Sequence, residues 1–371
     1  MERKFDKKIL LIDDSALMRR VMSDIIEQID GYTVVHLASD GLEGIQYLRA
    51  HTSDIDVIMT DIDMPGMDGL TLIKQAKEEH ITIPFIVFSA REDAYAVFTA
   101  LELGAIEFIK KPKGIFQKDA GHYADKVKKA LLMAVEVGER ENRLKAASAD
   151  AATLDKPVDK LRQNRKTQGT ASLRSKSRKL VAIVCSTGGP RALQSVIPKL
   201  PKNLAAPVVL VQHMPEGFTN TLAMRLNEQS ELSVKEAEPG DVLQEGHVYI
   251  AKGGTHLALK KTERGCETYC EDIAPIGGLK PCGNIMLKSL CTSPYDEIIC
   301  VILTGMGADG TKGIQELANH KEIYVIAQDE ETSTVYGMPR SVYEAGLCDC
   351  VCSLPRIAEE ITKKVGVQEW I

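Results

Sequence analysis

The sequence has no long apolar run, and this absence restricts where the protein works. None of its apolar segments reaches the roughly 20 residues that cross a bilayer. The N-terminal stretch also lacks the apolar core of a secretory signal peptide. We therefore expect a cytoplasmic location and no membrane insertion. The 9 cysteines, an odd number in a chain without an export signal, agree with reduced thiols in a cytoplasm.

An excess of positive charge and a helix-turn-helix pattern are missing too, so no nucleic acid is expected as a ligand. The formal net charge is -6, which gives no electrostatic reason to bind a polyanion. What is present is the composition of a soluble globular protein, with 44% hydrophobic and 26% charged residues. A chain of 371 residues is long enough for two domains, each with its own core.

Short apolar runs alternate with helical patterns over residues 1–138. The runs that predict strands lie at residues 8–12, 33–38, 56–60, 84–88 and 106–109. Amphipathic segments such as residues 16–28 lie between them. This alternation predicts an α/β domain with a doubly wound parallel sheet, in which ligands bind at the carboxyl ends of the strands.

Polar side chains gather at those strand ends. Asp13 and Asp14 follow the first predicted strand, Asp61 the third, Ser89 the fourth and Lys111 the fifth. Three converging carboxylates repel one another, and Mg²⁺ would neutralise them. A lysine and a hydroxyl suit the oxygens of a phosphoryl group. The alternative, surface acids with a salt-bridged lysine, requires the convergence to be accidental.

This domain resembles the receiver domains of bacterial two-component response regulators, which have a flavodoxin-like fold. The matching segments are Leu10-Leu-Ile-Asp-Asp-Ser15, Thr60-Asp-Ile-Asp-Met-Pro-Gly66, Phe88-Ser-Ala90 and Phe108-Ile-Lys-Lys-Pro112. The resemblance implies that Asp61 accepts phosphate and that Mg²⁺ lies on Asp13, Asp14 and Asp61. It also implies that Ser89 and Lys111 read the phosphoryl group and that Phe108 packs differently when this group is present.

Residues 139–179 have the composition of a linker. Periodicity fades there, and residues 160–179 are basic, with no acid among them. Such a stretch predicts a flexible, solvated tether, and contact with an acidic partner or a membrane surface is the alternative. The helical pattern that enters it from Asp125 is expected to fray near Lys145.

The strand-then-helix rhythm returns over residues 180–371 and predicts a second doubly wound, Rossmann-like parallel sheet. Strands are expected at residues 180–185, 208–212, 247–250, 298–303, 322–328 and 348–352. Helices are expected at residues 192–197, 218–228, 310–319 and 354–365.

A serine ends the first of these strands. Glycines at 188 and 189 turn the chain after Ser186, and Pro190 stands where a helix begins. This is the layout of a nucleophile elbow, in which helix-end amides hold an oxyanion. For this stretch alone, a phosphate-binding or merely structural turn explains the pattern equally well.

A histidine and an aspartate follow two further central strands. His213 comes directly after residues 208–212, and Asp309 lies in the loop after residues 298–303. With Ser186 they supply a nucleophile, a general base and an orienting carboxylate at one edge of the sheet. A rival base, His256, follows a hairpin-like turn and is interpreted as a substrate-loop or supporting residue.

The second domain resembles the chemotaxis response-regulator methylesterases, the CheB family. The matching segments are Ser186-Thr-Gly-Gly189, Gln212-His-Met-Pro215, Val234-Lys-Glu-Ala237, Gly253 to His256, Leu303-Thr-Gly-Met-Gly307 with Asp309-Gly310, Ile326-Ala-Gln328 and Gly337-Met-Pro-Arg340. The resemblance implies removal of methyl esters from glutamates of chemoreceptors, with a chemotaxis histidine kinase as phosphodonor. It gives Ser186, His213 and Asp309 the catalytic roles and places oxyanion amides near Thr187 and Met306, with no cofactor for ester hydrolysis.

Two alternatives stay open on the sequence. The same three residues could deamidate receptor glutamines, as a second activity or as the only one. The second domain could instead be a non-catalytic signalling adaptor, although an adaptor has no need of all three side chains. For regulation, we hypothesise that the unphosphorylated receiver covers the Ser186 rim, so a 180–371 fragment should exceed the unphosphorylated chain in activity.

Three features depart from the family pattern. Val184 and Cys185 stand where smaller residues are usual before the serine. Lys280-Pro-Cys-Gly-Asn284 replaces an Arg-Pro-Ser-x-Asp pattern, and we expect this segment to shape substrate binding rather than chemistry. Cys348-Asp-Cys-Val-Cys352 invites a metal hypothesis, but without a histidine or second cysteine pair nearby, buried thiols are favoured.

Overall fold

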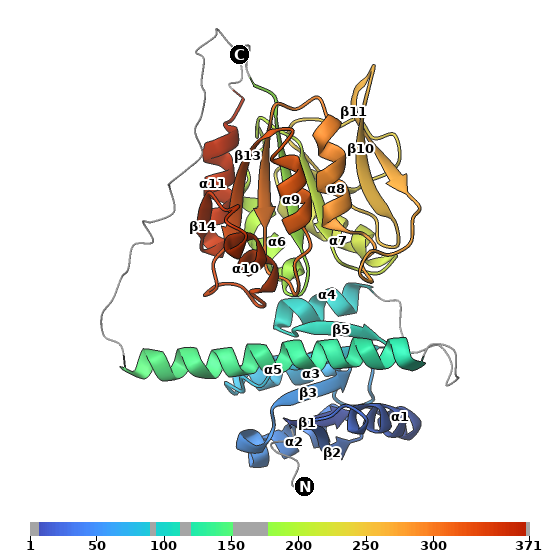
Figure 1. Cartoon of the computed structure of the whole chain (residues 1–371). Coiled ribbons are helices and arrows are strands. Elements are labelled where there is room, and N and C mark those ends of the chain that lie inside the picture. Colours follow the sequence, from blue (N-terminus) through green and yellow to red (C-terminus); the bar gives the residue numbers. More distant parts are fainter. Residues whose placement is uncertain (1–6, 90–93, 112–119, 151–176, 369–371) are drawn as a thin grey trace. The chain divides into compact units, whose positions relative to one another are not determined.

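The computed structural model describes residues 7–89, 94–111, 120–150 and 177–368. The chain divides into two compact units, Met1–Asp155 and Lys156–Ile371 (Figure 1). No helix in the described ranges is long and apolar enough to cross a membrane.

The first unit is a five-stranded parallel sheet in the order β2-β1-β3-β4-β5. Its strands are β1 (Lys7–Ile12), β2 (Tyr32–Ala38), β3 (Val57–Asp61), β4 (Phe85–Ser89) and β5 (Glu107–Lys110). Its helices are α1 (Ala16–Glu27), α2 (Gly41–His51), α3 (Gly69–Glu78), α4 (Ala94–Leu103) and α5 (Ala120–Asp150), with the short 3₁₀ helix η1 (Thr52–Asp54). All five predicted strands are present, and the predicted fold class is confirmed.

Helix α5 extends further than its sequence pattern predicts. It continues through Lys145 to Asp150, so residues 139–150 of the predicted linker are helical. This stretch is rich in alanine, glutamate, arginine and lysine, which favour helix even without an apolar stripe. Glu139 also pairs with Lys7 at 2.7 Å, which ties the helix to the first residue of β1. The rest of the predicted tether, residues 151–176, lies outside the described residues.

The second unit is built on a seven-stranded parallel sheet in the order β14-β13-β12-β6-β7-β9-β8. Its strands are β6 (Lys179–Cys185), β7 (Val208–Gln212), β8 (Ser233–Glu236), β9 (His247–Ile250), β12 (Glu297–Ile302), β13 (Glu322–Gln328) and β14 (Cys350–Cys352). A separate antiparallel hairpin consists of β10 (His256–Thr262) and β11 (Gly265–Glu271). The six predicted strands are found, whereas β8 and the hairpin were not predicted.

Helices connect these strands. They are α6 (Gly189–Val196), α7 (Phe218–Gln229), α8 (Gly283–Ser289), α9 (Thr311–Leu317), α10 (Gly337–Glu344) and α11 (Leu354–Val365), with the 3₁₀ helices η2 (Ile197–Lys199) and η3 (Leu290–Thr292). The short helices α8 and α10 were missed, since one or two turns carry too few apolar positions to show a period.

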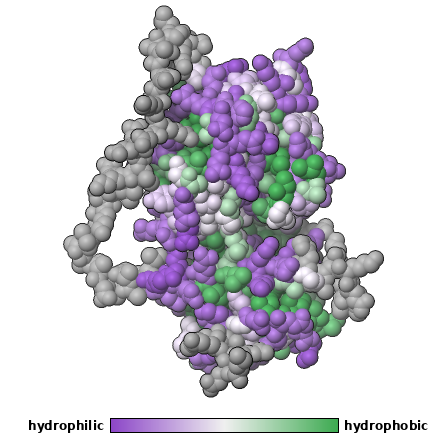
Figure 2. All heavy atoms as spheres, viewed as in Figure 1, coloured by the Kyte–Doolittle hydropathy of each residue, from purple (hydrophilic) through white to green (hydrophobic). Residues whose placement is uncertain are grey.

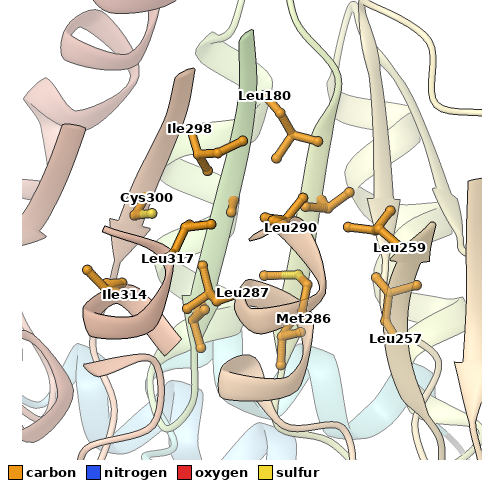
Figure 3. Close-up of a cluster of buried hydrophobic side chains, with 14 of the residues drawn as sticks. Leu180, Leu257, Leu259, Met286, Leu287, Leu290, Ile298, Cys300, Ile314 and Leu317 are labelled. Carbon is orange, nitrogen blue, oxygen red and sulfur yellow. The ribbon is translucent and has the colours of Figure 1, made fainter. Parts of the chain in front are cut away.

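Apolar side chains from the sheet, the hairpin and the helices α8, α9 and α10 form one core cluster of this unit (Figure 3). Leu287 of α8, Leu317 of α9 and Ile298 of β12 belong to this cluster, and Leu257 and Leu259 enter it from the hairpin. Each of these five side chains is at most 2% exposed. Truncating one such leucine costs about 2–5 kcal/mol, so the core fixes how α8 and α9 meet the ends of β6 and β12.

The surface contrasts with this interior. On the visible face, hydrophilic side chains predominate, and the apolar ones form small separate patches (Figure 2). The apolar residues of the central strands β6, β7 and β12 are instead fully buried. This is the pattern expected for parallel strands that have helices on both faces.

Candidate functional sites at the strand ends

The first candidate site is the end of the first sheet, where a lysine lies between two buried carboxylates. Lys111 Nζ is 2.5 Å from Asp13 Oδ2 and 2.7 Å from Asp61 Oδ2. Burial raises the pKa of Asp61, and the negative charge of Asp13 raises it further. The hydrogen bond and positive charge of Lys111 lower this pKa, but it stays above its ordinary value. The two carboxylates are therefore only partly neutralised by the one lysine.

The acidic residues of this rim suit a divalent cation. Asp13, Asp14 and Asp61 each offer a carboxylate oxygen, and these oxygens lie within 4.8 Å of one another. It is the one such grouping found over the described parts of the chain. Its donors are all hard oxygens, as Mg²⁺ prefers, and the crowded charge gives a cation a reason to bind. The predicted Mg²⁺ residues therefore fit the ion.

The remaining predicted receiver residues lie on β4 and β5. Ser89 is buried at the end of β4, and its carbonyl accepts a 2.9 Å hydrogen bond from the Lys111 amide. Phe108 lies half-buried on β5, opposite Val87 of β4. The motif residues Ala90 and Pro112 lie outside the described residues.

One residue of this rim was missed from the sequence. Arg19 of α1 donates from Nη1 to the carbonyl oxygens of Asp13 and Asp14, at 2.5 and 3.2 Å. It therefore holds the acidic loop through its backbone. Its position one turn into the helix after the aspartates was the available signal.

The second candidate site is at the carboxyl ends of β6, β7 and β12. Cys185 pairs with Gln212 across β6 and β7, and His213 N–H donates to Cys185 O at 3.2 Å. Ser186 and His213 are thus the next residues on neighbouring strands, which run about 4.8 Å apart. Both are partly exposed.

His213 also contacts the predicted aspartate. Its Nε2 lies 2.8 Å from Asp309 Oδ2, and the two side chains are only 8% and 3% exposed. Its Nδ1 is buried and has no hydrogen-bond partner within the described ranges. The ring nitrogen left for the serine is therefore Nδ1.

The turn after Ser186 needs glycine for two separate reasons. Gly188 has a φ of 76° and forms the N-cap of α6, a conformation that L side chains rarely adopt. A Cβ on Gly189 would lie 2.0 Å from Gln212 Oε1. Pro190 then falls in the first turn of α6, as the sequence predicts.

A buried glutamine links the serine to the histidine. Gln212 Nε2 donates to the carbonyl oxygens of Ser186 and His213, at 3.0 and 3.2 Å. Gln212 Oε1 accepts from Cys185 Sγ at 3.0 Å. The unusual cysteine before the serine therefore has a donor role. The role of Gln212 was not predicted from the sequence.

Asp309 is surrounded by donors. Cys282 Sγ lies 3.2 Å from Oδ1, Asn284 N–H donates to Oδ1 at 2.9 Å, and Gly283 N–H donates to Oδ2 at 2.5 Å. Burial alone would raise its pKa, but the hydrogen bond and charge of His213 and the amides of Gly283 and Asn284 outweigh burial and lower the pKa to about 2. The carboxylate therefore stays ionised.

These contacts come from the segment from Lys280 to Asn284, which departs from the family pattern. We predicted that it shapes substrate binding rather than chemistry, but it contacts the aspartate of the site directly. Val184, which stands where a smaller residue is usual, packs against the same segment, since a Cβ on Gly283 would lie 2.4 Å from Val184 Cγ1. The valine occupies the space that the glycine leaves.

The predicted oxyanion residues are on the two loops nearest the serine. Thr187 is buried directly after Ser186, and Met306 is 41% exposed in the loop after β12. A Cβ on the neighbouring Gly305 would lie 2.8 Å from Ser186 Cβ, so this loop packs against the serine. The rival His256 is fully buried at the start of β10, where Nε2 lies 3.3 Å from Ala274 O.

The cysteines form no metal site that the described ranges reveal. All nine are free, and the acidic cluster is the one metal-ligand grouping in those ranges. In the cluster at β14, Cys352 is buried, while Cys348 and Cys350 are half-buried.

These features define a two-domain α/β protein with an acidic receiver-type rim on one sheet and a serine, a histidine and an aspartate at the end of the other. Residues 9–117 match the family model described as "Response regulator receiver domain", and residues 181–361 match "CheB methylesterase". The chain therefore belongs to the CheB methylesterase family of enzymes and carries a response-regulator receiver domain. Both resemblances seen in the sequence are confirmed.

Full-length relatives agree. A protein of Syntrophomonas wolfei named protein-glutamate methylesterase/protein-glutamine glutaminase 1 is 38% identical over 361 residues, covering 96% of this chain and 98% of the relative. A Thermotoga maritima protein named protein-glutamate methylesterase/protein-glutamine glutaminase is 38% identical over 359 residues, with 96% and 98% covered. The solved Thermotoga maritima CheB methylesterase catalytic domain is 46% identical, covers 51% of this chain and 100% of its own, and has a TM-score of 0.49.

Proposed function

We propose that the second unit hydrolyses methyl esters on glutamate side chains of chemoreceptors, releasing methanol, and that phosphorylation of the first unit controls this activity. The observation that carries the proposal is the 2.8 Å bond between His213 and Asp309 at the strand end beside Ser186. The names of the relatives supply the substrate class.

In the proposed mechanism Ser186 Oγ attacks the ester carbonyl carbon, while His213 Nδ1 takes the hydroxyl proton. Asp309, bound to Nε2, orients the ring and stabilises the imidazolium. The tetrahedral intermediate expels methoxide, which takes the proton from Nδ1 and leaves as methanol. Water, activated by the same nitrogen, then cleaves the acyl-enzyme and leaves a free glutamate.

The loops carrying Thr187 and Met306 supply the amides proposed for the oxyanion. Support for this placement comes from Gly305, which packs against Ser186, and from Thr304, whose carbonyl accepts the Ser186 amide at 3.0 Å. Amides fixed in such a frame need no rearrangement as charge develops.

For control, Asp61 is proposed to accept a phosphoryl group from a chemotaxis histidine kinase. Mg²⁺ held by Asp13, Asp14 and Asp61 would neutralise the incoming charge. Lys111, already 2.7 Å from Asp61, would pair with the phosphoryl oxygens, with Ser89 beside it. Phe108 is proposed to repack in response.

Deamidation of receptor glutamines is a second candidate activity, because the relatives' names include it. An amide is a related acyl substrate, and ammonia would replace methanol as the product. We propose that the enzyme acts in the cytoplasm, a reducing compartment in which the nine free thiols are stable.

The test is release of methanol and of ammonia from methylated and amidated receptor membranes, with Ser186→Ala as control. We expect methanol from the native enzyme and none from the variant. Ammonia alone would establish the deamidase instead. If neither methanol nor ammonia were released, the non-catalytic adaptor would be the remaining explanation.

A further inference from the structure

We infer that Cys282 and Asn284 are positioning residues for Asp309. They belong to a set of reciprocal hydrogen bonds, here called the clasp, between the loop before α8 and the loop before α9. The inference rests on the proposed function, because it gives Asp309 its catalytic partner. It assigns to this segment a contribution to the rate of the reaction rather than to receptor binding.

One side of the clasp holds the carboxylate. Oδ1 of Asp309 accepts from Cys282 Sγ at 3.2 Å and from Asn284 N at 2.9 Å. Oδ2 accepts from Gly283 N at 2.5 Å and shares its other side with His213 Nε2 at 2.8 Å. With both oxygens held, the carboxylate cannot turn away from the imidazole.

The other side of the clasp returns the contact. Asn284 Oδ1 accepts from the amides of Gly310 and Gly313, at 3.1 and 2.7 Å. These amides belong to the N-cap and first turn of α9, directly after Asp309. Each loop therefore satisfies the donors of the other, and Asn284 fixes the backbone that carries Asp309.

Close packing keeps the two loops together. A Cβ on Gly313 would lie 2.8 Å from Leu287 Cβ and 3.0 Å from Asn284 Cα. Leu287 and Met286 of α8 belong to the core cluster (Figure 3). The helices cannot separate without opening the core, so the clasp geometry is held rigidly.

The side-chain chemistry suits these roles. Cys282 is 1% exposed, and burial raises its pKa to about 12, so the thiol keeps the proton that it donates. A thiol is a weak donor and a hydroxyl a stronger one, so serine should replace it. Asn284 offers a side-chain oxygen as acceptor for the two amides, and an aspartate at this position would offer an oxygen in the same place.

The experiment compares paired variants of the full chain: Cys282→Ala with Cys282→Ser, and Asn284→Ala with Asn284→Asp. For each we measure kcat and KM for methanol release from receptor membranes. We expect each alanine variant to lose about 10-fold in kcat at constant KM, since a buried acceptor or donor loses its partner. Serine and aspartate should restore kcat to within about 2-fold, because they keep the hydrogen bonds.

A second readout needs no substrate. The proton between His213 Nε2 and Asp309 should give a downfield NMR resonance in the native chain and in Cys282→Ser, and a shifted or broadened one in Cys282→Ala. A rise in KM at constant kcat would overturn the inference in favour of substrate binding. An unchanged resonance and unchanged kcat in both alanine variants would also overturn it.

The two claims fail separately. If the native chain released no product that depends on Ser186, this would count against the proposed function. The NMR resonance would still report on the clasp. Full native activity in Cys282→Ala would count against the clasp alone.

Discussion

The two strand-end sites are built by the same rule but treat a buried carboxylate in opposite ways. Asp309 receives three donors from one neighbouring segment and a fourth contact from His213, and its pKa falls to about 2. Asp61 shares one lysine with Asp13, and its pKa stays above the ordinary value. One site is complete within the chain, and the other is short of positive charge.

This difference corresponds to what each site is proposed to do. A hydrolytic site gains from groups fixed before the substrate arrives, because nothing has to reorganise in the transition state. A regulatory site gains from an unbalanced arrangement that a cation and a phosphoryl group change on binding. On the proposed function, the carboxyl ends of a parallel sheet would carry a rigid site in one domain and a responsive site in the other.

The largest effect is expected from Asp309→Asn. The amide cannot accept from all the donors that hold the carboxylate, and it cannot stabilise an imidazolium, so kcat should fall about 10³–10⁴-fold. Steady-state methanol release checks this. A loss of less than about 10-fold would mean that Asp309 is not the partner of the catalytic base.

The next effect concerns the crowded acidic rim. Asp13→Asn removes one of the three carboxylates, so Mg²⁺ affinity should fall about 10–100-fold. Calorimetric titration of the full chain with Mg²⁺ measures this, and Asp24→Asn, on the exposed face of α1, is the control. Equal affinity in both variants would place the ion elsewhere.

A smaller effect is expected from Gln212→Ala, which cuts the link between the carbonyls of Ser186 and His213. We expect kcat to fall about 10-fold, because two buried acceptors lose their donor. Gln229→Ala, at the exposed end of α7, should leave kcat unchanged. A Gln212 variant with native kcat would show that strand pairing alone aligns the two residues.

The smallest effect is the pH dependence of stability. Because the folded pKa of Asp309 lies below its ordinary value, its stabilisation is present above about pH 4 and is lost as the pH falls toward 2. At pH 3 the loss should be about 1 kcal/mol. Urea unfolding of native and Asp309→Asn chains at pH 7 and pH 3 measures it, and a difference between them that does not shrink at pH 3 would contradict the assigned cause.

Much of both sheets was predictable, because buried parallel strands read as continuous apolar runs that end in polar residues. Asp61, Ser186, His213 and Asp309 could be found this way, since each follows such a run. The edge strand β8 could not, because only Val234 of its four residues is buried. The hairpin lies outside the main sheet and packs against α8, and an alternation of apolar residues along the sequence does not reveal such a partner.

The supporting residues were harder to predict than the reactive ones. Cys282 and Asn284 contact Asp309 from 27 and 25 positions away in the chain, and no local sequence pattern predicts that contact. Gln212 was visible in a matching segment, but its two carbonyl partners depend on strand register. The roles of such residues follow from tertiary contacts rather than from their own chemistry.

The most direct test of the contrast between the two sites is methanol release with and without a small phosphodonor and Mg²⁺, in the native chain and in Asp61→Asn. Our account predicts that the donor stimulates the native enzyme, that Asp61→Asn keeps the unstimulated rate, and that its ratio of stimulated to unstimulated rate is one. Stimulation that persists in Asp61→Asn would contradict the assignment of the first site as the regulatory one.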